Sequence, residues 1–157
     1  MSEIYHHTQV GVVMLVVLAF ALAGLLWAGT QEGWPAGLAG VLVAIAACLI
    51  LFTTLTVHIA DGVVAVRFGP GLPRRAIPLA EIESARAVRN SWLTGYGIRR
   101  VGSGWLWNVS GRDAVEIKLA NGRTFRIGTD EPEELLRALG QAGARTMAVV
   151  AGTERPR

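Results

Sequence analysis

Two long stretches without charged residues restrict the fold of this chain more than any other feature. Residues 10–30 and 35–60 contain no Asp, Glu, Lys or Arg, and hydrophobic residues make up 52% of the whole sequence. That share exceeds what the core of a soluble domain of this size requires. An α-helix needs roughly 20 apolar residues to cross a hydrocarbon core of about 30 Å. We therefore expect a two-helix transmembrane hairpin over residues 10–54, after a cytoplasmic N-terminal tail over residues 1–9.

The first apolar run also has the general character of a secretory signal peptide, which would be cleaved from the mature chain. The preceding residues MSEIYHHTQ carry no Lys or Arg, however, and the run is longer than the apolar core of a normal signal peptide. A retained membrane helix is therefore the better interpretation.

Basic residues lie on one side of the expected hairpin. Its loop carries Glu32 and no basic residue, whereas Arg67, Arg74 and Arg75 follow the second run. Cytoplasmic flanks of membrane helices are enriched in Lys and Arg, so both termini are expected to face the cytoplasm.

Small residues recur at helical spacing on both apolar runs. Small side chains let two membrane helices approach closely, so these residues fit either a contact within the hairpin or a contact with a partner helix. The candidate packing residues are Gly24 and Ala28 on the first run and Ala36, Gly40, Ala44 and Cys48 on the second.

From Leu55 onward, apolar and polar residues alternate with the period of a β-strand. LTVHIA and VVAVRF flank Asp61-Gly62, a dipeptide that tolerates the positive φ angles of a type I′ turn, so they predict a β-hairpin. DAVEIKLA and RTFRIGT flank Asn121-Gly122 and predict a second hairpin. EIESARAV and WLWN are further strand candidates, PGLP is expected to be a loop, and residues 90–104 show no clear period.

The segment TDEPEELLRAL changes to helical spacing. Either Thr129 or Asp130 is placed to cap the helix, Pro132 fits its first turn, and three leucines form an apolar face. About seven short antiparallel strands followed by one helix predict a domain of the α+β or all-β class, a bent sheet or split barrel closed by that helix. We expect this domain over residues 55–142, with a C-terminal tail over residues 143–157.

The segment WLTGYGIRRVGSGWLWNVSGRDAVEIKLANGRTFRIGTDEPEELLRAL resembles the second half of a bacterial pleckstrin-homology-like (PH-like) domain. The resemblance covers roughly residues 55–139 and depends most on GIRR, GWLWNVSG and IGTDEPEELL. It implies a seven-stranded split barrel with a C-terminal helix, attached to membrane spans in the inner membrane of a bacterium. It also implies a role in scaffolding, oligomerisation or membrane-surface interaction, and it brings no catalytic motif.

The sequence offers few residues for catalysis or metal binding. His6 and His7 lie in the expected tail and His58 lies beside the membrane, so no pattern joins them to Ser103 or Ser110 as a base and a nucleophile. Adjacent histidines without cysteine ligands predict a solvated pair. GYG and GSG do not fit a phosphate-binding glycine motif. We therefore expect no enzymatic activity, no metal and no cofactor.

Arginines carry most of the basic charge after residue 68 and fall in or beside predicted loops. Each basic residue near an anionic membrane contributes about 1 kcal/mol to binding, but simple solvation explains the same placement equally well. Trp105 and Trp107 alternate as core residues do, which argues against nucleic-acid binding. The candidate partner or lipid surface comprises Arg74, Arg75, Trp92, Tyr96, Arg99, Arg100 and Arg112.

These patterns together predict a membrane-anchored, non-enzymatic accessory or scaffold protein. Its domain is expected to mediate protein–protein interaction or assembly at the cytoplasmic membrane face. The expected partners are membrane lipids and either other membrane proteins or further copies of the chain. The alternative is a domain that binds anionic lipid headgroups.

Overall fold

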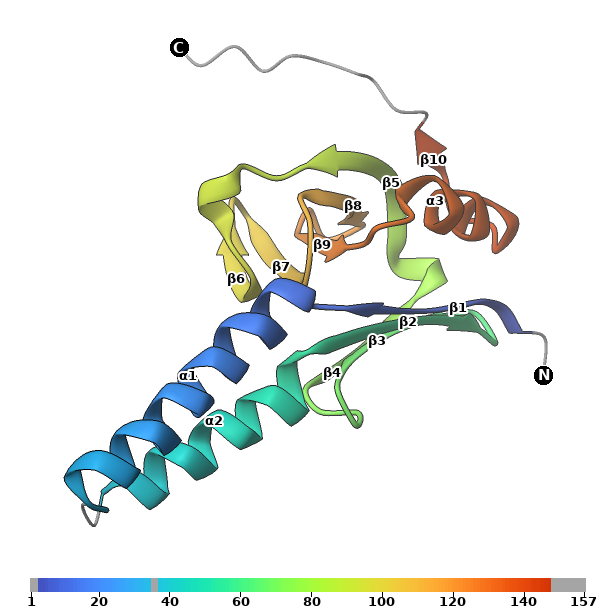
Figure 1. Ribbon diagram of the computed structural model, residues 1–157. Coiled ribbons are helices and arrows are strands. Elements are labelled where there is room, and N and C mark those ends of the chain that lie inside the picture. Colours follow the sequence, from blue (N-terminus) through green and yellow to red (C-terminus); the bar gives the residue numbers. More distant parts are fainter. Residues whose placement is uncertain (1–2, 35–36, 148–157) are drawn as a thin grey trace, which may run out of the picture.

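The computed structural model describes residues 3–34 and 37–147. Two long helices form an arm that extends from a domain of two β-sheets and a third helix (Figure 1). The helices are α1 (Val12–Glu32), α2 (Leu38–Phe52) and α3 (Pro132–Gln141), and two short 3₁₀ turns are η1 (Leu79–Glu81) and η2 (Trp92–Thr94).

The arm is a helical hairpin in which α1 and α2 lie side by side (Figure 1). Large apolar residues spaced three or four apart face the neighbouring helix, as they do wherever two helices pack along their length. The half-buried residues of this seam include Leu18, Leu22 and Leu25 of α1 and Leu42, Ile45 and Leu49 of α2. Most other apolar residues of the arm are exposed, so the arm presents an apolar surface to its surroundings.

The two helices of the arm differ in length. Within α1, the segment Val12–Gln31 is long and apolar enough to cross a membrane. The second helix has 15 residues, which at the rise of an α-helix is about 22 Å and less than a typical hydrocarbon core. Of the two predicted membrane spans, α1 alone is therefore long enough to cross a typical hydrocarbon core. The second run is shortened because the helix ends at Phe52 and the chain continues as a strand from Thr54.

The first sheet has the strand order β1-β2-β3-β4, with all neighbours antiparallel. The hairpin predicted around Asp61-Gly62 is confirmed, and both residues have positive φ angles, 49° and 77°. The strands are β1 (Glu3–Val10), β2 (Thr54–Ala60), β3 (Val63–Phe68) and β4 (Arg74–Pro78).

The N-terminal segment predicted to be a tail is strand β1, so that prediction is wrong. It pairs with β2 from Glu3 opposite Ala60 to Val10 opposite Thr54, with one shift of register between Glu3 and Tyr5. Its inward side chains are polar or amphipathic residues rather than aliphatic ones, so hydropathy alone gives no strand signal.

The second sheet has the order β10-β5-β8-β9-β7-β6. The hairpin predicted around Asn121-Gly122 is confirmed as β8-β9. Two neighbouring pairs are parallel, β7 with β9 and β10 with β5, so the sheet is only mostly antiparallel. Its strands are β5 (Ile82–Arg89), β6 (Gly97–Val101), β7 (Gly104–Asn108), β8 (Asp113–Leu119), β9 (Thr124–Gly128) and β10 (Thr146–Met147).

The C-terminal tail predicted for residues 143–157 is also wrong in part, because β10 lies within that range and belongs to the second sheet. The backbone N–H of Ala85 donates to the carbonyl of Arg145 at 2.8 Å, which begins this parallel pairing. The rest of the predicted tail, residues 148–157, lies outside the described residues.

The core of the domain lies between the two sheets and α3. The predicted apolar face of α3 is confirmed, since Leu135, Leu136 and Leu139 are buried. At the centre, the ring of Trp107 lies 5.3 Å from that of Phe68 and 5.6 Å from that of Phe125, measured between centroids. The contact of Trp107 with Phe68 joins the second sheet to the first, and its contact with Phe125 lies within the second sheet.

The arm joins the domain without a linker on either chain segment. β1 leads into α1 and α2 leads into β2, so a pair of helices continues a pair of strands (Figure 1). Two backbone hydrogen bonds hold the junction. The Gly11 N–H donates to the Thr53 carbonyl at 2.6 Å, and the Gly69 N–H donates to the Thr54 carbonyl at 3.0 Å. The rings of Phe52 and Phe68 add an apolar contact between arm and sheet, at 5.6 Å between centroids.

Candidate functional site

The structure divides the seven predicted surface residues among three places. Arg74 and Arg75 begin β4 on the first sheet. Arg75 lies over the ring of buried Phe125, with 4.8 Å from its guanidinium carbon to the ring centroid. This contact covers the core, so Arg75 has a structural role in addition to its charge.

Arg99 and Arg100 lie on β6, an edge strand of the second sheet, and both are exposed. The Arg99 side chain folds back and its Nε donates to the carbonyl of Tyr96 at 3.1 Å. Charged residues on an open edge also discourage pairing with strands of other molecules.

The remaining three residues, Trp92, Tyr96 and Arg112, converge on one pocket of about 240 Å³ between η2 and the turn from β7 to β8. Trp92 and its neighbour Leu93 are 74% and 72% exposed, which is unusual for such large apolar side chains in the sheet domain. The pocket is lined by Asn90, Ser91, Trp92, Gly95, Tyr96, Asn108, Gly111 and Arg112.

Asn90 is a buried polar residue of this pocket that the sequence patterns did not predict. It is 3% exposed and its backbone is held by Arg112, whose carbonyl accepts from the Asn90 N–H at 2.7 Å. The Arg112 Nε in turn donates to the Asn90 carbonyl at 3.2 Å. The Asn90 Oδ1 accepts from Arg126 Nη1 at 3.2 Å, while its Nδ2 has no partner among the described residues.

Arg126 is itself positioned by Glu116, a carboxylate that is 8% exposed. Arg126 Nε donates to Glu116 Oε2 at 2.6 Å, and Arg86 donates to Oε1 through Nε at 2.9 Å and Nη2 at 2.7 Å. Burial alone raises the pKa of Glu116, but the hydrogen bonds and charges of Arg126 and Arg86 outweigh it and hold that pKa below its usual value. The carboxylate therefore stays ionised and fixes the guanidinium that orients Asn90.

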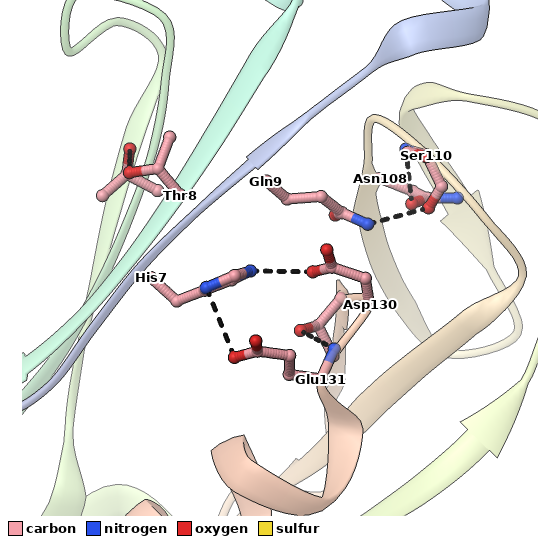
Figure 2. A network of polar contacts seen from close by, with 9 residues as sticks. His7, Thr8, Gln9, Asn108, Ser110, Asp130 and Glu131 are labelled. Carbon is pink, nitrogen blue, oxygen red and sulfur yellow. Dashed lines mark hydrogen bonds and ion pairs between the residues drawn. The ribbon is translucent and has the colours of Figure 1, made fainter.

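A second polar cluster joins β1 to the beginning of α3 (Figure 2). His7 Nε2 lies 2.7 Å from Asp130 Oδ1, and His7 Nδ1 lies 3.3 Å from Glu131 Oε2. The prediction of a solvated histidine pair is therefore wrong for His7, because its strand carries it across to the start of α3. His6 points to the other face of the strand, where its ring lies 5.8 Å from that of His58.

Tyr5 and Gln9 flank His7 on the same face of β1. The Gln9 Nε2 donates to the carbonyl of Ser110 at 3.2 Å, which ties β1 to the turn after β7 (Figure 2). Burial, followed by the negative charge of Glu131, raises the pKa of Tyr5 to about 12. In the part of the chain that the structure describes, no three His, Cys, Asp or Glu residues are arranged to hold a metal ion.

The predicted packing residues of the arm lie mostly away from the helix–helix seam. An added Cβ at Gly24 or Gly40 would meet no atom within 4 Å. Ala44 and Cys48 are exposed and Ala28 is half-buried, while Ala36 lies outside the described residues. The seam of the hairpin is formed mostly by large side chains, and Gly40, Ala44 and Cys48 of α2 face outward.

The fold and these surfaces define a class of protein, a mostly antiparallel two-sheet domain carried directly on an apolar helical hairpin. No protein-family model and no curated protein matches the sequence.

Proposed function

We propose that this chain is a membrane-anchored, non-enzymatic accessory or scaffold protein that assembles with other membrane proteins or with copies of itself. The observation that carries the proposal is the junction without a linker. A domain bound to the arm by two continuous chain segments, the Gly11–Thr53 hydrogen bond and the Phe52–Phe68 contact cannot swing freely. Such a domain would present fixed surfaces to a neighbour at one membrane face.

In this proposal α1 crosses the bilayer and the shorter α2 returns beside it, both in the inner membrane of a bacterium, with the termini cytoplasmic. Modest thinning of the bilayer or shielding by a partner helix accommodates a helix of this length. The outward small residues of α2 support lateral docking, since helices associate in lipid through close backbone approach. The proposed family is the bacterial PH-like one, on the resemblance of residues 55–139 described above.

Lateral docking is testable with one pair of matched substitutions. Ala44→Leu places a large side chain on the outward face that carries Gly40, whereas Ala39→Leu adds the same atoms at an exposed position on another side of α2. The full-length protein extracted in a mild detergent or in native nanodiscs is expected to retain a stoichiometric partner or to form a homo-oligomer. Ala44→Leu should release the partner or dissociate the oligomer and Ala39→Leu should not. A wild-type monomer in native nanodiscs would refute the proposal.

A second candidate function is binding of anionic lipid headgroups by the domain. The exposed Trp92 and Leu93 favour it, with Arg112 on the same pocket as Trp92 and Arg99 bound to the Tyr96 carbonyl, because aromatic and basic residues together suit a membrane interface. In full-length protein reconstituted with brominated anionic lipid, the quenching difference between wild type and Trp92→Phe should be large and should decrease as salt rises. Equal quenching of the two proteins would exclude a headgroup contact at Trp92.

A further inference from the structure

The turn between β3 and β4, residues 69–73, lies against the last turn of α2 (Figure 1). A Cβ added at Gly69 would lie 2.8 Å from the Leu51 carbonyl oxygen and would also meet the carbonyl of Ile50. The Gly69 N–H donates to the Thr54 carbonyl at 3.0 Å, just after the end of α2. This segment, the β3–β4 turn, is therefore held in a fixed position beside the arm.

The side chains of the β3–β4 turn are apolar. Its sequence, GPGLP, contains no polar side chain, and Leu72 is 65% exposed. Ile50 of α2, whose backbone Gly69 approaches, is 64% exposed. The apolar outer surface of the arm therefore continues onto this turn. A single exposed leucine is common on soluble domains, but this one adjoins an apolar surface too large to be favourable in water.

The backbone of the β3–β4 turn also suits an apolar environment. Unpaired N–H groups are costly in hydrocarbon, because no water is present to accept from them. Pro70 and Pro73 have no N–H, so the five residues of the turn have three such groups. The Gly71 N–H donates to the Phe68 carbonyl at 2.9 Å, and the Gly69 N–H is bonded as described above. The Phe68 N–H donates to the Pro73 carbonyl at 3.0 Å and closes the turn.

Two arginines limit how deeply the β3–β4 turn can enter a membrane. Arg67 of β3 and Arg74 of β4 border the turn, lie directly opposite each other in the strand pairing and are both exposed. A charged side chain is unfavourable in hydrocarbon. At the interface, a long basic side chain keeps its charge among the headgroups and its aliphatic stem on apolar surface. An apolar tip followed by two basic residues therefore suits the boundary between headgroups and hydrocarbon.

We propose that the β3–β4 turn is a third membrane-contacting element of the chain, which inserts Leu72 into the outer edge of the hydrocarbon beside α2. This inference rests on the membrane anchoring of the arm proposed above. It differs from headgroup binding at Trp92 in its place and in its chemistry, since an apolar insertion requires no anionic lipid. A contact outside the two helices holds the arm end of the first sheet against the bilayer and limits tilting of the domain.

Fluorescent labels on single cysteines of the reconstituted full-length chain test the insertion. In a Cys48→Ala background, Leu72→Cys and Ala80→Cys place the same environment-sensitive label two residues before and two residues after β4. Both positions are exposed, and the five residues of β4 separate them by about 17 Å at the rise of a strand. The exposed wild-type Cys48, labelled in the same way, reports whether the arm itself lies in lipid.

The vesicles consist of phosphatidylcholine with a small share of the same lipid that bears a nitroxide quencher near the headgroup end of its acyl chain. We expect the label at Leu72→Cys to be quenched several-fold more than the label at Ala80→Cys and to emit at shorter wavelength. High salt and added phosphatidylglycerol should leave this quenching unchanged, because salt screens charges and does not weaken apolar insertion.

Equal quenching of the labels at Leu72→Cys and Ala80→Cys, with Cys48 quenched, would overturn the insertion and leave the anchoring intact. Quenching at Leu72→Cys that requires phosphatidylglycerol or disappears at high salt would assign the contact to headgroup charge and overturn the insertion as well. An unquenched label on Cys48 would refute the membrane anchoring, and the insertion with it.

Discussion

Among the described residues, Glu116 is a charged side chain that the domain buries, and two arginines hold it. Glu116 accepts from Arg86 on β5 and Arg126 on β9, so one carboxylate connects three adjacent strands. Removing one member of a buried charge pair destabilises a protein by more than the intact pair stabilises it, because the remaining charge is left buried without a partner.

Glu116→Gln should therefore destabilise the protein by about 2 kcal/mol at neutral pH. The folded state lowers the pKa of Glu116, so its contribution is present above the pKa of the unfolded chain and is lost as pH falls through the folded value. Thermal unfolding in detergent at several pH values measures this effect. The variant should lose part of the acid sensitivity of wild type, and identical curves would show that the carboxylate is not ionised in the folded protein.

The raised pKa of Tyr5 leads to a prediction at alkaline pH. Its pKa of about 12 in the folded protein lies above the ordinary value of about 10. The contribution of Tyr5 to stability is therefore fully present below the ordinary pKa and is lost as pH rises through the pKa of the folded protein. In a Tyr96→Phe background Tyr5 is the one tyrosine left, and tyrosinate absorbance then reports its titration directly. A midpoint at the ordinary value would mean that β1 does not pack against the start of α3.

At the scale of elements, periodicity predicted the structure wherever one face of a segment is aliphatic. The β2-β3 and β8-β9 hairpins and the helix α3 follow the predicted patterns. Strand β1 was missed because Tyr5, His7 and Gln9 form its inner face, and their partners lie more than a hundred residues away in sequence. Asn90 was missed because its partners also come from other segments, Arg112 from the turn before β8 and Arg126 from β9.

The junction between arm and sheet gives a prediction at this scale. An added Cβ at Gly11 would lie 2.7 Å from the Val109 carbonyl oxygen and 3.2 Å from the Thr53 carbonyl oxygen. Gly11→Ala should then cost about 1–3 kcal/mol through overpacking. Gly24→Ala is the control, because open space surrounds that position and alanine is the better helix former. Thermal unfolding of both variants in detergent tests this, and equal stability would show that the close approach at Gly11 is not required.

For the molecule as a whole, the proposed function depends on where the arm resides. Exposed apolar residues such as Phe20, Trp27 and Val43 would be unfavourable in water over so large a surface, and lipid or protein must cover them. Because the arm continues the first sheet directly, the place of the arm also fixes the place of that sheet. The central claim is therefore that α1 and α2 cross a bilayer and leave the domain on one side.

Labelling of single cysteines in sealed vesicles gives a direct test of this topology. Cys48 is the only cysteine, so a Cys48→Ala background accepts Gly33→Cys in the hairpin loop or Asn121→Cys in the domain. We predict that a membrane-impermeant maleimide reaches these two positions from opposite sides of the membrane. Labelling of both from the same side would contradict the claim.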